Sequence, residues 1–335
     1  MIRCRREHTQ QGGAKTGGPI VHGTFGDKDG ESVSPLAVID VGSNTIHLLV
    51  GEVENGAVLP ITGEKVSARL GAGVDETGSI EKDRIPLAVD AIRLFARLAA
   101  LNGAAQPAVL ATSAVRDAKN GRVLVEKVLE KAGLEMRLIS GDEEALLGFR
   151  GAVSALGPDF SWDTSVLVVD LGGGSAQLIL GDAANGPQKR VSLPLGSNRT
   201  TERFVHHDPP EAGELDELRQ AVLGMLPKWE LPEDAPVVAI GGSARATLRL
   251  ARDELTVESL WELAQEISAR PSAVLAREEG LAPERARVLP AAVITLATIL
   301  EHFSGSQLTV VRGGIREGAI LTMADEILNG SNSKE

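Results

Sequence analysis

The chain has 335 residues, of which 43% are hydrophobic and 3% aromatic, and its formal net charge is −12. This length suffices for two lobes of ordinary size, and their cores must consist of Val, Leu, Ile and Ala because tyrosine is absent. The negative charge argues against broad nucleic-acid binding, which needs a basic surface, and the single cysteine excludes an intramolecular disulfide and fits a reducing compartment.

The N-terminal segment differs in composition from the rest of the chain. Residues 1–34 are rich in Gly, Gln, Lys, His and Asp and show almost no apolar pattern, so we expect a disordered leader. No apolar stretch follows the basic residues near its start, which argues against a secretory signal. The longest apolar stretch, at 289–300, is too short to span a bilayer. We therefore expect a cytoplasmic protein that does not bind a membrane.

The first structured element that the pattern predicts is a hairpin with an acidic residue at its tip. A short apolar run ends in Asp40, and a loop and a second apolar run at 46–50 follow it. In a Walker or Rossmann loop a helix follows the glycines, whereas here a second strand follows them. The pattern therefore predicts a phosphate loop of a different kind. Its residues Gly42, Ser43 and Asn44 would let a phosphate approach the backbone N–H groups closely. Considered alone, the element fits equally well a tight hairpin whose Asp stabilises its own turn.

Strands and helices alternate through the rest of the first half. Asn55 and Gly56 predict a two-residue turn into a third antiparallel strand, and apolar residues at helical spacing predict a helix from 85 to about 102. The elements expected after it are a strand at 107–111, a loop with Thr112, Ser113 and Arg116, a helix at about 122–131, a strand at 136–139 and a helix at 142–155. The order of elements is therefore βββαβαβα.

The second half repeats the opening pattern. An apolar run ends in Asp170, the loop residues Gly172, Gly173, Gly174 and Ser175 follow, and the chain continues with a second strand, an Asn-Gly turn and a third strand. The elements expected after these are a helix at 212–226, a strand at 236–240 with a glycine loop at 241–243, helices within 244–303, a strand at 308–311 and a closing helix. The helix at 288–303 is apolar on nearly every side and should be buried. Because the pattern occurs twice, the interpretation of the first hairpin as an isolated tight turn is weakened.

Two repeated βββαβαβα lobes that face each other across a cleft are typical of one α/β fold. It is the duplicated ribonuclease-H-like fold of the actin, hexokinase and Hsp70 superfamily, with a phosphate cleft between the lobes at the strand ends. We expect lobe I at 35–142, lobe II at 143–316, and a C-terminal helix at 317–329 that packs back on lobe I. This fold-level analogy does not distinguish a kinase, a chaperone or a phosphatase.

Several linked motifs resemble the exopolyphosphatase and guanosine pentaphosphate phosphohydrolase family, Ppx/GppA. They occur in the family's order at 39–45, 69–71, 111–118, 139–145, 170–175, 195–196, 241–245 and 313–318. The resemblance covers about residues 36 to 322 and is to a short two-domain form, without the C-terminal helical extension of longer members. It implies a hydrolase acting on acid anhydrides, which uses Mg²⁺ or Mn²⁺ to release the terminal phosphate of inorganic polyphosphate or guanosine pentaphosphate. We expect these compounds or guanosine tetraphosphate as ligands, and a homodimer as the assembly.

The repeat and the resemblance together assign the two loop-tip carboxylates to a metal. Asp40 and Asp170 should face each other across the cleft, and such a pair suffices for Mg²⁺ when water and substrate oxygens complete its ligands. The backbones of the two glycine loops, at 42–44 and 172–175, should hold phosphate oxygens. Two aspartates that only stabilise turns are the simpler alternative, which the repeated motif disfavours.

For two neighbouring glutamates, the local sequence pattern and the position in the family motif predict different roles. Ser140 and Glu143 form a capping-box pattern, and acids in the first turn of a helix complement its dipole, so the pattern alone makes Glu144 a helix-start acid as well. The resemblance makes Glu144 the catalytic residue that orients or deprotonates the attacking water and leaves Glu143 in the cap. It also makes Arg116 a catalytic arginine that clamps the phosphate, where a solvated surface arginine is the alternative. Asp170 is expected to take part in catalysis as a metal ligand.

One position departs from the family pattern. Gln177 stands where members usually carry an acid, and a neutral amide cannot replace a carboxylate beside a metal. Gln177 is therefore a third candidate for the metal site whose missing charge counts against it. It motivates an alternative function, a polyphosphate- or (p)ppGpp-binding or sensing protein with weak turnover. A phosphotransferase of the sugar-kinase type shares the fold, and the linked motifs disfavour it.

Histidines and further arginines complete the set of candidates. His47 lies on an apolar strand and is expected to be a core histidine with its hydrogen bonds satisfied. His206 and His207 precede a Pro-rich loop and are expected at the surface. Arginines near other loops of the cleft are Arg199, Arg245 and Arg316.

Overall fold

The computed structural model describes residues 34–157, 160–161 and 163–332. The leader predicted at 1–34 therefore lies outside the described residues, apart from Ser34. Within the part of the chain that is described, no helix is long and apolar enough to cross a membrane.

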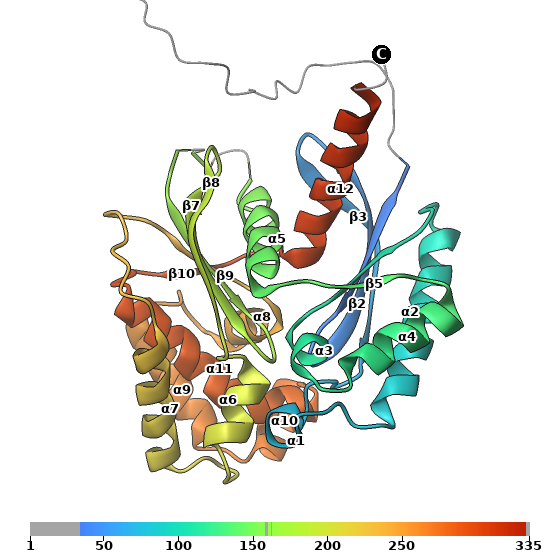
Figure 1. The fold of residues 1–335 in the computed structure, drawn as a ribbon. Helices are drawn as coiled ribbons and strands as arrows, with labels where there is room; N and C mark the ends of the chain where they lie inside the picture. The colour runs from blue at the N-terminus through green and yellow to red at the C-terminus, as the bar shows by residue number, and fades with distance from the viewer. Residues whose placement is uncertain (1–33, 158–159, 162, 333–335) are drawn as a thin grey trace, which may run out of the picture. The chain divides into compact units, whose positions relative to one another are not determined.

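The first sheet has the strand order β3-β2-β1-β4-β5 (Figure 1). Its strands are β1 (Leu36–Val41), β2 (Thr45–Glu54), β3 (Ala57–Ser67), β4 (Ala108–Ala111) and β5 (Met136–Leu138). β1, β2 and β3 pair antiparallel, whereas β4 pairs parallel with β1 and β5 pairs parallel with β4. The predicted turn between β2 and β3 is confirmed, because Asn55 and Gly56 take the positive φ angles, 49° and 75°, that a two-residue hairpin loop requires.

The second sheet has the strand order β10-β9-β6-β7-β8. Its strands are β6 (Val166–Leu171), β7 (Ala176–Asp182), β8 (Gly186–Leu193), β9 (Val237–Ile240) and β10 (Leu308–Val310). β6, β7 and β8 pair antiparallel, and β9 and β10 extend the sheet from β6 in parallel. This is the pairing scheme of the first sheet with β6 in the place of β1. The duplicated α/β architecture that the sequence predicts is therefore confirmed.

The helices of the described chain cover both faces of each sheet. They are α1 (Val74–Thr77), α2 (Arg84–Leu101), α3 (Ser113–Asp117), α4 (Gly121–Ala132), α5 (Gly141–Ser154), α6 (Ser197–Phe204), α7 (Ala212–Met225), α8 (Gly242–Leu250), α9 (Val257–Ser268), α10 (Ser272–Glu279), α11 (Pro283–His302) and α12 (Ile315–Asn332). α11 is buried from 288 to 300, as its apolar sequence predicts.

Three short helices differ from the expectation. α3 replaces the loop expected after β4, and α1 and α6 lie where the pattern predicts no element. α6 gives no apolar signal because the side chains it buries include Ser197, Thr200 and Thr201. Polar side chains of this kind are buried when nearby backbone groups accept their hydrogen bonds, as the Gly196 carbonyl oxygen does for Thr200 at 3.0 Å.

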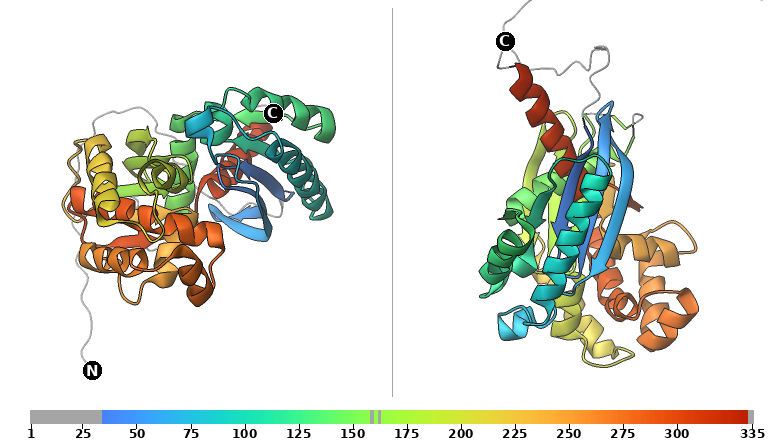
Figure 2. Two further views of the ribbon diagram at one scale, coloured as in Figure 1. Left: turned by 90° about the horizontal axis from the view of Figure 1, so that it is seen from below. Right: turned by 90° about the vertical axis from the view of Figure 1, so that its right-hand side faces the viewer.

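α5 lies between the two sheets and packs on both (Figures 1 and 2). Towards the first sheet, Leu147 of α5 shares a cluster with Val38 of β1 and Ile320 of α12. Towards the second sheet, Ala145 and Phe149 pack with β6, β7 and β9. α2 and α4 cover the opposite face of the first sheet, and α7, α9 and α11 cover the opposite face of the second. Residues on the α5 side of both sheets therefore point towards each other.

Glycines allow α5 and α12 to cross in direct backbone contact. A Cβ atom at Gly151 would lie 2.0 Å from the Gly314 carbonyl oxygen, and one at Gly318 would lie 1.9 Å from the Leu147 carbonyl oxygen. A larger residue at either position would force the backbones apart. Beyond the crossing, α12 packs on β1, β2 and β3 of the first sheet. The lobe boundaries at 142 and 316 stay a prediction.

Candidate active site

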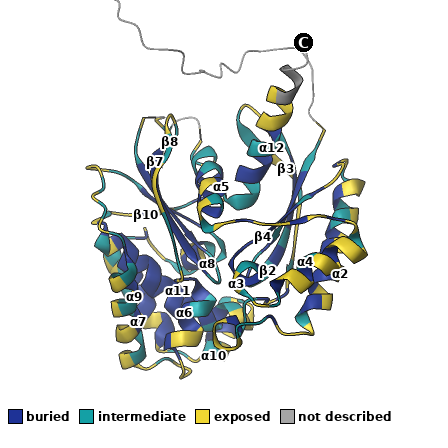
Figure 3. Ribbon diagram, in the orientation of Figure 1, coloured by how far each residue is buried: buried dark blue, intermediate teal, exposed yellow. Residues whose placement is uncertain are grey.

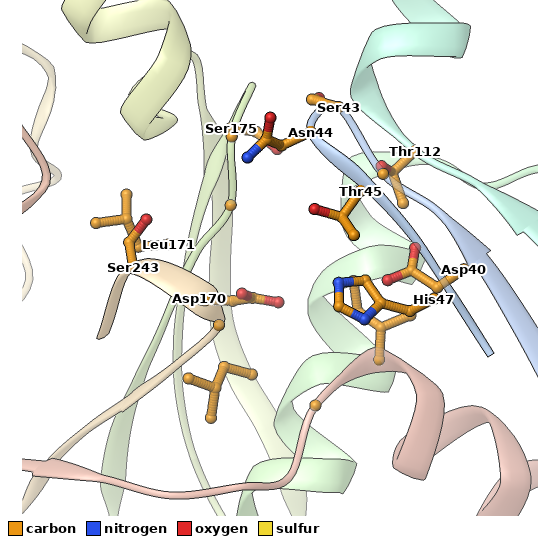
Figure 4. Close-up of a pocket in the computed structure, with 18 of the residues that line it drawn as sticks. Asp40, Ser43, Asn44, Thr45, His47, Thr112, Asp170, Leu171, Ser175 and Ser243 are labelled. Carbon is orange, nitrogen blue, oxygen red and sulfur yellow. The ribbon is translucent and has the colours of Figure 1, made fainter. Parts of the chain in front are cut away.

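A cavity of about 140 Å³ lies between the ends of the two sheets (Figure 4). Its lining comes from the β1–β2 and β6–β7 hairpin tips, from the starts of α5 and α8, and from the loop before α12. The lining residues that the sequence predicts are Asp40, Gly42, Ser43, Asn44, Glu144, Asp170, Gly172, Gly173, Gly174, Ser175, Arg245 and Arg316. The repeated hairpin thus brings both of its copies to one cavity.

Asp40 and Asp170 occupy matching places in the two sheets. Asp40 lies on the strand face of Val38, and Asp170 on that of Val168, so both side chains are on the side of their sheet that packs on α5. Figure 4 shows their carboxylates directed into the cavity from opposite sides. Asp170 is 8% exposed, and Oδ1 of Asp40 is buried without a hydrogen-bond partner among the described residues.

The surroundings disfavour the charged forms of three carboxyl groups in the cavity. Burial raises the pKa of Asp40 to about 6, although the positive charge of Arg316 opposes this. Burial also raises the pKa of Asp170 to about 7, and the charge of Asp40 adds to the effect. The pKa of Glu144 rises to about 8, first through burial and then through the charge of Asp170. A positive charge placed among these groups would stabilise all three carboxylates.

This set of donors fits a divalent cation. Buried carboxylate oxygens are the ligands that Mg²⁺ and Mn²⁺ prefer, and Oδ1 of Asp40 has its acceptor positions free. Within the described ranges, no group of three or more His, Cys, Asp or Glu side chains could hold a metal ion. A cation held by Asp40 and Asp170 would therefore take oxygens of water and substrate as its remaining ligands.

The two glycine loops present backbone donors to the cavity. Gly42 and Gly172 each donate within their own turn, to the carbonyl oxygens of Thr45 and Ser175 at 3.2 and 3.0 Å. The next N–H groups have no acceptor among the residues that the structure describes; they belong to Ser43, Asn44, Gly173 and Gly174. Successive unpaired N–H groups form concave sites for anions. Each loop can therefore bind phosphate oxygens.

The two loops also touch each other. Ser43 Oγ lies 3.0 Å from Ser113 Oγ, and a Cβ atom at Gly174 would lie 2.6 Å from both hydroxyl oxygens. Because glycine has no side chain, the loop of the second sheet approaches this closely. Both loops are therefore near enough to share one phosphate group.

Glu144 reaches the cavity from the first turn of α5 and is 5% exposed. Nη1 of Arg116 donates to Glu144 Oε2 at 3.2 Å and to the Ile139 carbonyl oxygen at 2.9 Å. Arg116 itself is not one of the described residues that line the cavity. In this arrangement its guanidinium positions Glu144, and the clamping role expected from the motif stays a prediction.

The start of α5 is capped in part as the sequence predicts. Ser140 Oγ accepts a hydrogen bond from the Glu143 backbone N–H at 3.1 Å. The Glu143 carboxylate, however, pairs with Arg137 and does not return to the N-cap backbone. The reciprocal capping box is therefore incomplete, because the Arg137 guanidinium of β5 pairs with the Glu143 carboxylate instead.

Gln177 is buried behind the glycine loop. It is 1% exposed and does not belong to the described lining of the cavity. Its Nε2 donates to Ser175 Oγ at 2.9 Å and to Ser192 Oγ at 3.0 Å. The start of α5 packs on one of these partners, since a Cβ atom at Gly141 would lie 2.6 Å from the Ser192 Cβ. The amide is engaged by two hydroxyl groups, so the structure does not support the expected contact with a metal.

His47 lines the cavity beside Asp40, which corrects the expectation of a core histidine (Figure 4). It lies directly opposite Asp40 in the β1–β2 register, and opposite residues share one face of a sheet. Burial lowers its pKa to about 3, and the charges of Arg316 and Arg245 lower it further. The imidazole is therefore neutral at physiological pH. The hairpin register predicts this placement once Asp40 is assigned to the cleft.

A group of arginines lines the cavity beyond the carboxylates; its members are Arg245, Arg285, Arg312 and Arg316. Burial lowers the pKa of Arg245 and of Arg285, and the charge of Arg245 lowers that of Arg285 further. Nη1 of Arg285 donates to Ser243 Oγ at 3.0 Å, and neither guanidinium forms an ion pair with a described residue. Unpaired cations at a cavity favour an anionic ligand. Sequence reasoning missed Arg285 because only the packing of α11 brings it to the cavity. It also missed Arg312, although this residue directly precedes the glycines at 313 and 314, a signal that could have found it.

Arg199, expected near the cleft, lies outside this cavity. It forms ion pairs with Asp75 at 2.8 Å and with Asp117 at 3.1 Å. Since these partners lie in α1 and α3 and Arg199 lies in α6, the ion pairs link the two halves of the described chain. His206 and His207 are exposed, as expected.

Two similar α/β halves that each bring an aspartate and a glycine loop to a shared cavity define the actin-like class of phosphate-binding proteins. The model of the Ppx/GppA phosphatase family matches residues 49–327, so the chain belongs to this family. The family that the motifs predict, and with it the class of enzyme, is confirmed.

Relatives with assigned names support the same conclusion. Exopolyphosphatase 1 of Mycobacterium tuberculosis is 30% identical over 314 residues, which cover 88% of this chain and 90% of that protein. The guanosine-5'-triphosphate,3'-diphosphate pyrophosphatase of Vibrio campbellii is 30% identical over 309 residues, 88% of this chain and 60% of the relative. The crystal structure of the Aquifex aeolicus family member is 26% identical, with a TM-score of 0.73 over 87% of this chain and 98% of that one. Together with the two sheets, this similarity confirms the expected fold.

Proposed function

We propose that the protein is a Mg²⁺- or Mn²⁺-dependent phosphohydrolase that releases the terminal phosphate of inorganic polyphosphate or of guanosine pentaphosphate. The main support is that unpaired N–H groups of both glycine loops meet three carboxyl groups in one cavity. The N–H groups offer donors for phosphate oxygens, and the carboxyl groups can hold a cation and activate water. The named relatives, an exopolyphosphatase and a guanosine nucleotide phosphohydrolase, support the substrate class.

Asp40 and Asp170 are the residues that would hold the cation. When bound there, the cation would neutralise negative charge on the phosphate oxygens of the substrate. The raised pKa values of both carboxyl groups mean that protons compete with the cation for these oxygens. Cation affinity should therefore fall as the pH is lowered through the neutral range.

In the proposed reaction, the two glycine loops bind the terminal phosphate and Glu144 prepares the attacking water. Because Arg116 occupies Oε2 of Glu144, Oε1 is the oxygen that is free to take a proton from water. A pKa near neutrality suits a group that accepts a proton and returns it in each cycle. The water oxygen forms a bond to the terminal phosphorus, the anhydride bond on the opposite side breaks, and the shortened substrate leaves as a phosphate anion.

The arginine group supports a substrate with several phosphates. Arg245 and Arg285 carry two buried positive charges that no carboxylate of the described chain pairs. Polyphosphate and guanosine pentaphosphate both carry further phosphate groups next to the terminal one. We infer that these groups lie along the arginines while the terminal phosphate lies between the loops.

Phosphate release from each substrate, with Mg²⁺ and with EDTA, tests this proposal. We expect release from at least one of the two substrates with Mg²⁺ and its loss in EDTA. Polyphosphate should become shorter gradually in gel analysis, because removal from the end takes one phosphate at a time. Fragments from the middle of the chain, or release that needs no divalent cation, would contradict the proposal.

A polyphosphate- or (p)ppGpp-binding protein with weak turnover is the alternative, and the neutral Gln177 motivates it. If the missing charge limits turnover, Gln177→Glu should raise phosphate release about 10–100-fold at similar polyphosphate affinity. Gln177→Met is the matched control, because it keeps the length of the side chain but loses the hydrogen bonds to Ser175 and Ser192. A wild type that turns over rapidly and is unchanged by Gln177→Glu would remove the alternative.

The cytoplasmic location stays a prediction.

A further inference from the structure

Arg199 of α6 is connected to Glu144 of α5 through two residues of α3. Nη2 of Arg199 donates to Asp117 Oδ2 at 3.1 Å, and the other carboxylate oxygen, Oδ1, lies 3.4 Å from Nε of Arg116. Nη1 of Arg116 in turn donates to Glu144 Oε2 at 3.2 Å. The side chains of Arg199, Arg116 and Asp117 are 16%, 27% and 35% exposed, so water screens these contacts only in part. The four side chains form one continuous contact row from α6 to α5.

The start of α6 is bound to the glycine loop of the second sheet. The backbone N–H groups of Ser197 and Asn198 donate to the carbonyl oxygens of Gly172 and Gly173, both at 2.9 Å. The N–H group of Arg199 also donates to the Gly173 carbonyl oxygen, at 3.2 Å. The first residue of the contact row therefore has a fixed place relative to this loop.

Asp117 is the residue of the contact row that two guanidinium groups share. Its carboxylate offers one oxygen to Arg116 and the other to Arg199, which lets two like charges approach the same place. α3 is buried at 113–115, as Figure 3 shows, so the backbone before Asp117 is held in the fold. With its Nε end held by Asp117, the Arg116 guanidinium is directed towards Glu144.

α6 also contacts α1 and its N-cap, through a separate pair of interactions. Nε of Arg199 lies 2.8 Å from Asp75 Oδ1, and the Gly73 backbone N–H donates to the Glu202 carboxylate at 3.4 Å. Asp75 forms no other ion pair with a described residue, and none of the residues in these two interactions lines the cavity. Asp75 and Asp117 therefore both bind Arg199, but only Asp117 continues towards Glu144.

We propose that Asp117 and Arg199 are positioning residues for phosphate hydrolysis, which hold Arg116 against Glu144 and so fix Glu144 relative to the glycine loop of the second sheet. The inference rests on the proposed function, in which Glu144 prepares the water and the glycine loop binds the terminal phosphate. In-line attack needs water and phosphorus in a narrow range of positions. The contact row joins the two segments that hold them, while Asp117 and Arg199 themselves lie outside the cavity lining.

Steady-state kinetics of polyphosphate hydrolysis with Mg²⁺ test the proposal. Asp117→Asn should lower kcat about tenfold at an unchanged KM, because an amide has one oxygen and cannot accept from both guanidinium groups. Arg199→Gln should lower kcat about two- to fivefold, since the contact between Asp117 and Arg116 remains. Asp75→Asn is the matched control: it removes an ion pair of Arg199 but leaves the contact row intact, so kcat should not change.

Double variants show whether the two residues act through Arg116. In an Arg116→Met background, Asp117→Asn and Arg199→Gln should cause no further loss of kcat, because the side chain that transmits their effect is gone. Losses that multiply in the double variants would overturn the proposal. So would an equal loss of kcat in Asp75→Asn, which would mean that these ion pairs only hold the two halves of the chain together.

Hydrogen–deuterium exchange tests the contact row without relying on turnover. Arg116 also donates to the Ile139 carbonyl oxygen, so loss of its orientation should speed the exchange of backbone N–H groups at 139–144. We expect about threefold faster exchange there in Asp117→Asn and no change in Asp75→Asn. Unchanged exchange in Asp117→Asn would overturn the proposal, and Arg199→Gln decides the question if Asp117→Asn fails to fold.

The two measurements separate this inference from the proposed function. A wild type that releases phosphate from neither substrate would refute the proposed function, and hydrogen exchange would still decide whether Asp117 holds Arg116 in place. A wild type that releases phosphate, with kcat and exchange unchanged in Asp117→Asn, would refute only the positioning role.

Discussion

Arg116 holds Glu144 at the edge of the cavity through a hydrogen bond of 3.2 Å from Nη1 to Oε2. The two residues come from different helices, and the same Nη1 atom also donates to the Ile139 carbonyl oxygen, which fixes the guanidinium. The charge of Arg116 lowers the pKa of Glu144, against the larger effect of burial. Arg116 therefore keeps Glu144 closer to the range in which it can accept a proton at neutral pH.

Arg116→Met should lower kcat and shift its pH dependence. Without the guanidinium charge the pKa of Glu144 rises, so the rise of activity with pH should move to higher pH, with a loss of about 10–100-fold at neutral pH. A pH–rate profile measures both effects. Arg116→Lys is the control that keeps a positive charge and should show the smaller shift. An equal loss at every pH would mean that Arg116 serves the structure only.

Asp40→Asn should stabilise the protein in EDTA. The pKa of Asp40 in the folded state, about 6, lies above its usual 3.8, so folding disfavours the charged carboxylate. The wild type in EDTA should therefore gain stability as the pH falls through about 6, whereas the neutral Asn removes this dependence. At about pH 8 the variant should melt a few °C above the wild type, and the difference should vanish near pH 4.

Addition of Mg²⁺ to the same two proteins tests Asp40 as a ligand. The melting temperature of the wild type should rise with Mg²⁺, because binding to the folded state stabilises it, and that of Asp40→Asn should rise much less. Asp40→Asn should also lose metal-dependent phosphate release. If the variant gained as much from Mg²⁺ as the wild type, Asp40 would not be a metal ligand.

Gly151→Ala should destabilise the crossing of α5 and α12. A Cβ atom at Gly151 would lie 2.0 Å from the Gly314 carbonyl oxygen, so the two backbones must move apart at a cost of about 3 kcal/mol. Gly224→Ala is the matched control, since Gly224 also lies within a helix but has nothing within 4 Å of a Cβ atom. It should gain about 0.5–1 kcal/mol from helix propensity. Chemical denaturation measures both, and equal effects would contradict the crossing.

Local sequence pattern was sufficient to predict the two hairpins and the residues at their tips. An apolar run, an aspartate, a glycine loop and a second apolar run are contiguous in the chain, so the order of residues determines the placement of Asp40 and Asp170. The same applies to Ser140, whose capping partner lies three residues away. Burial of α11 followed from its composition alone.

Contacts between distant segments could not be predicted in this way. Arg285 is at the start of α11, and only the packing of that helix brings it to Ser243 and the cavity. Gln177 shares a strand face with Ser175, but it is buried and donates to Ser192 of the neighbouring strand, and side-chain alternation cannot show such a contact. Sequence pattern thus placed the residues at strand ends, and tertiary packing decided which of the others reach the cavity.

The most direct test of the proposed function is terminal phosphate release by Asp170→Asn with saturating Mg²⁺. Asp170 is one of the two proposed cation ligands; it lies one residue before the end of β6 and lines the cavity. We predict that kcat falls by at least about 10²–10³-fold, while the melting temperature in EDTA does not fall and polyphosphate still binds. Near-normal Mg²⁺-dependent release by Asp170→Asn would contradict the assignment of this cavity as the site of phosphate hydrolysis.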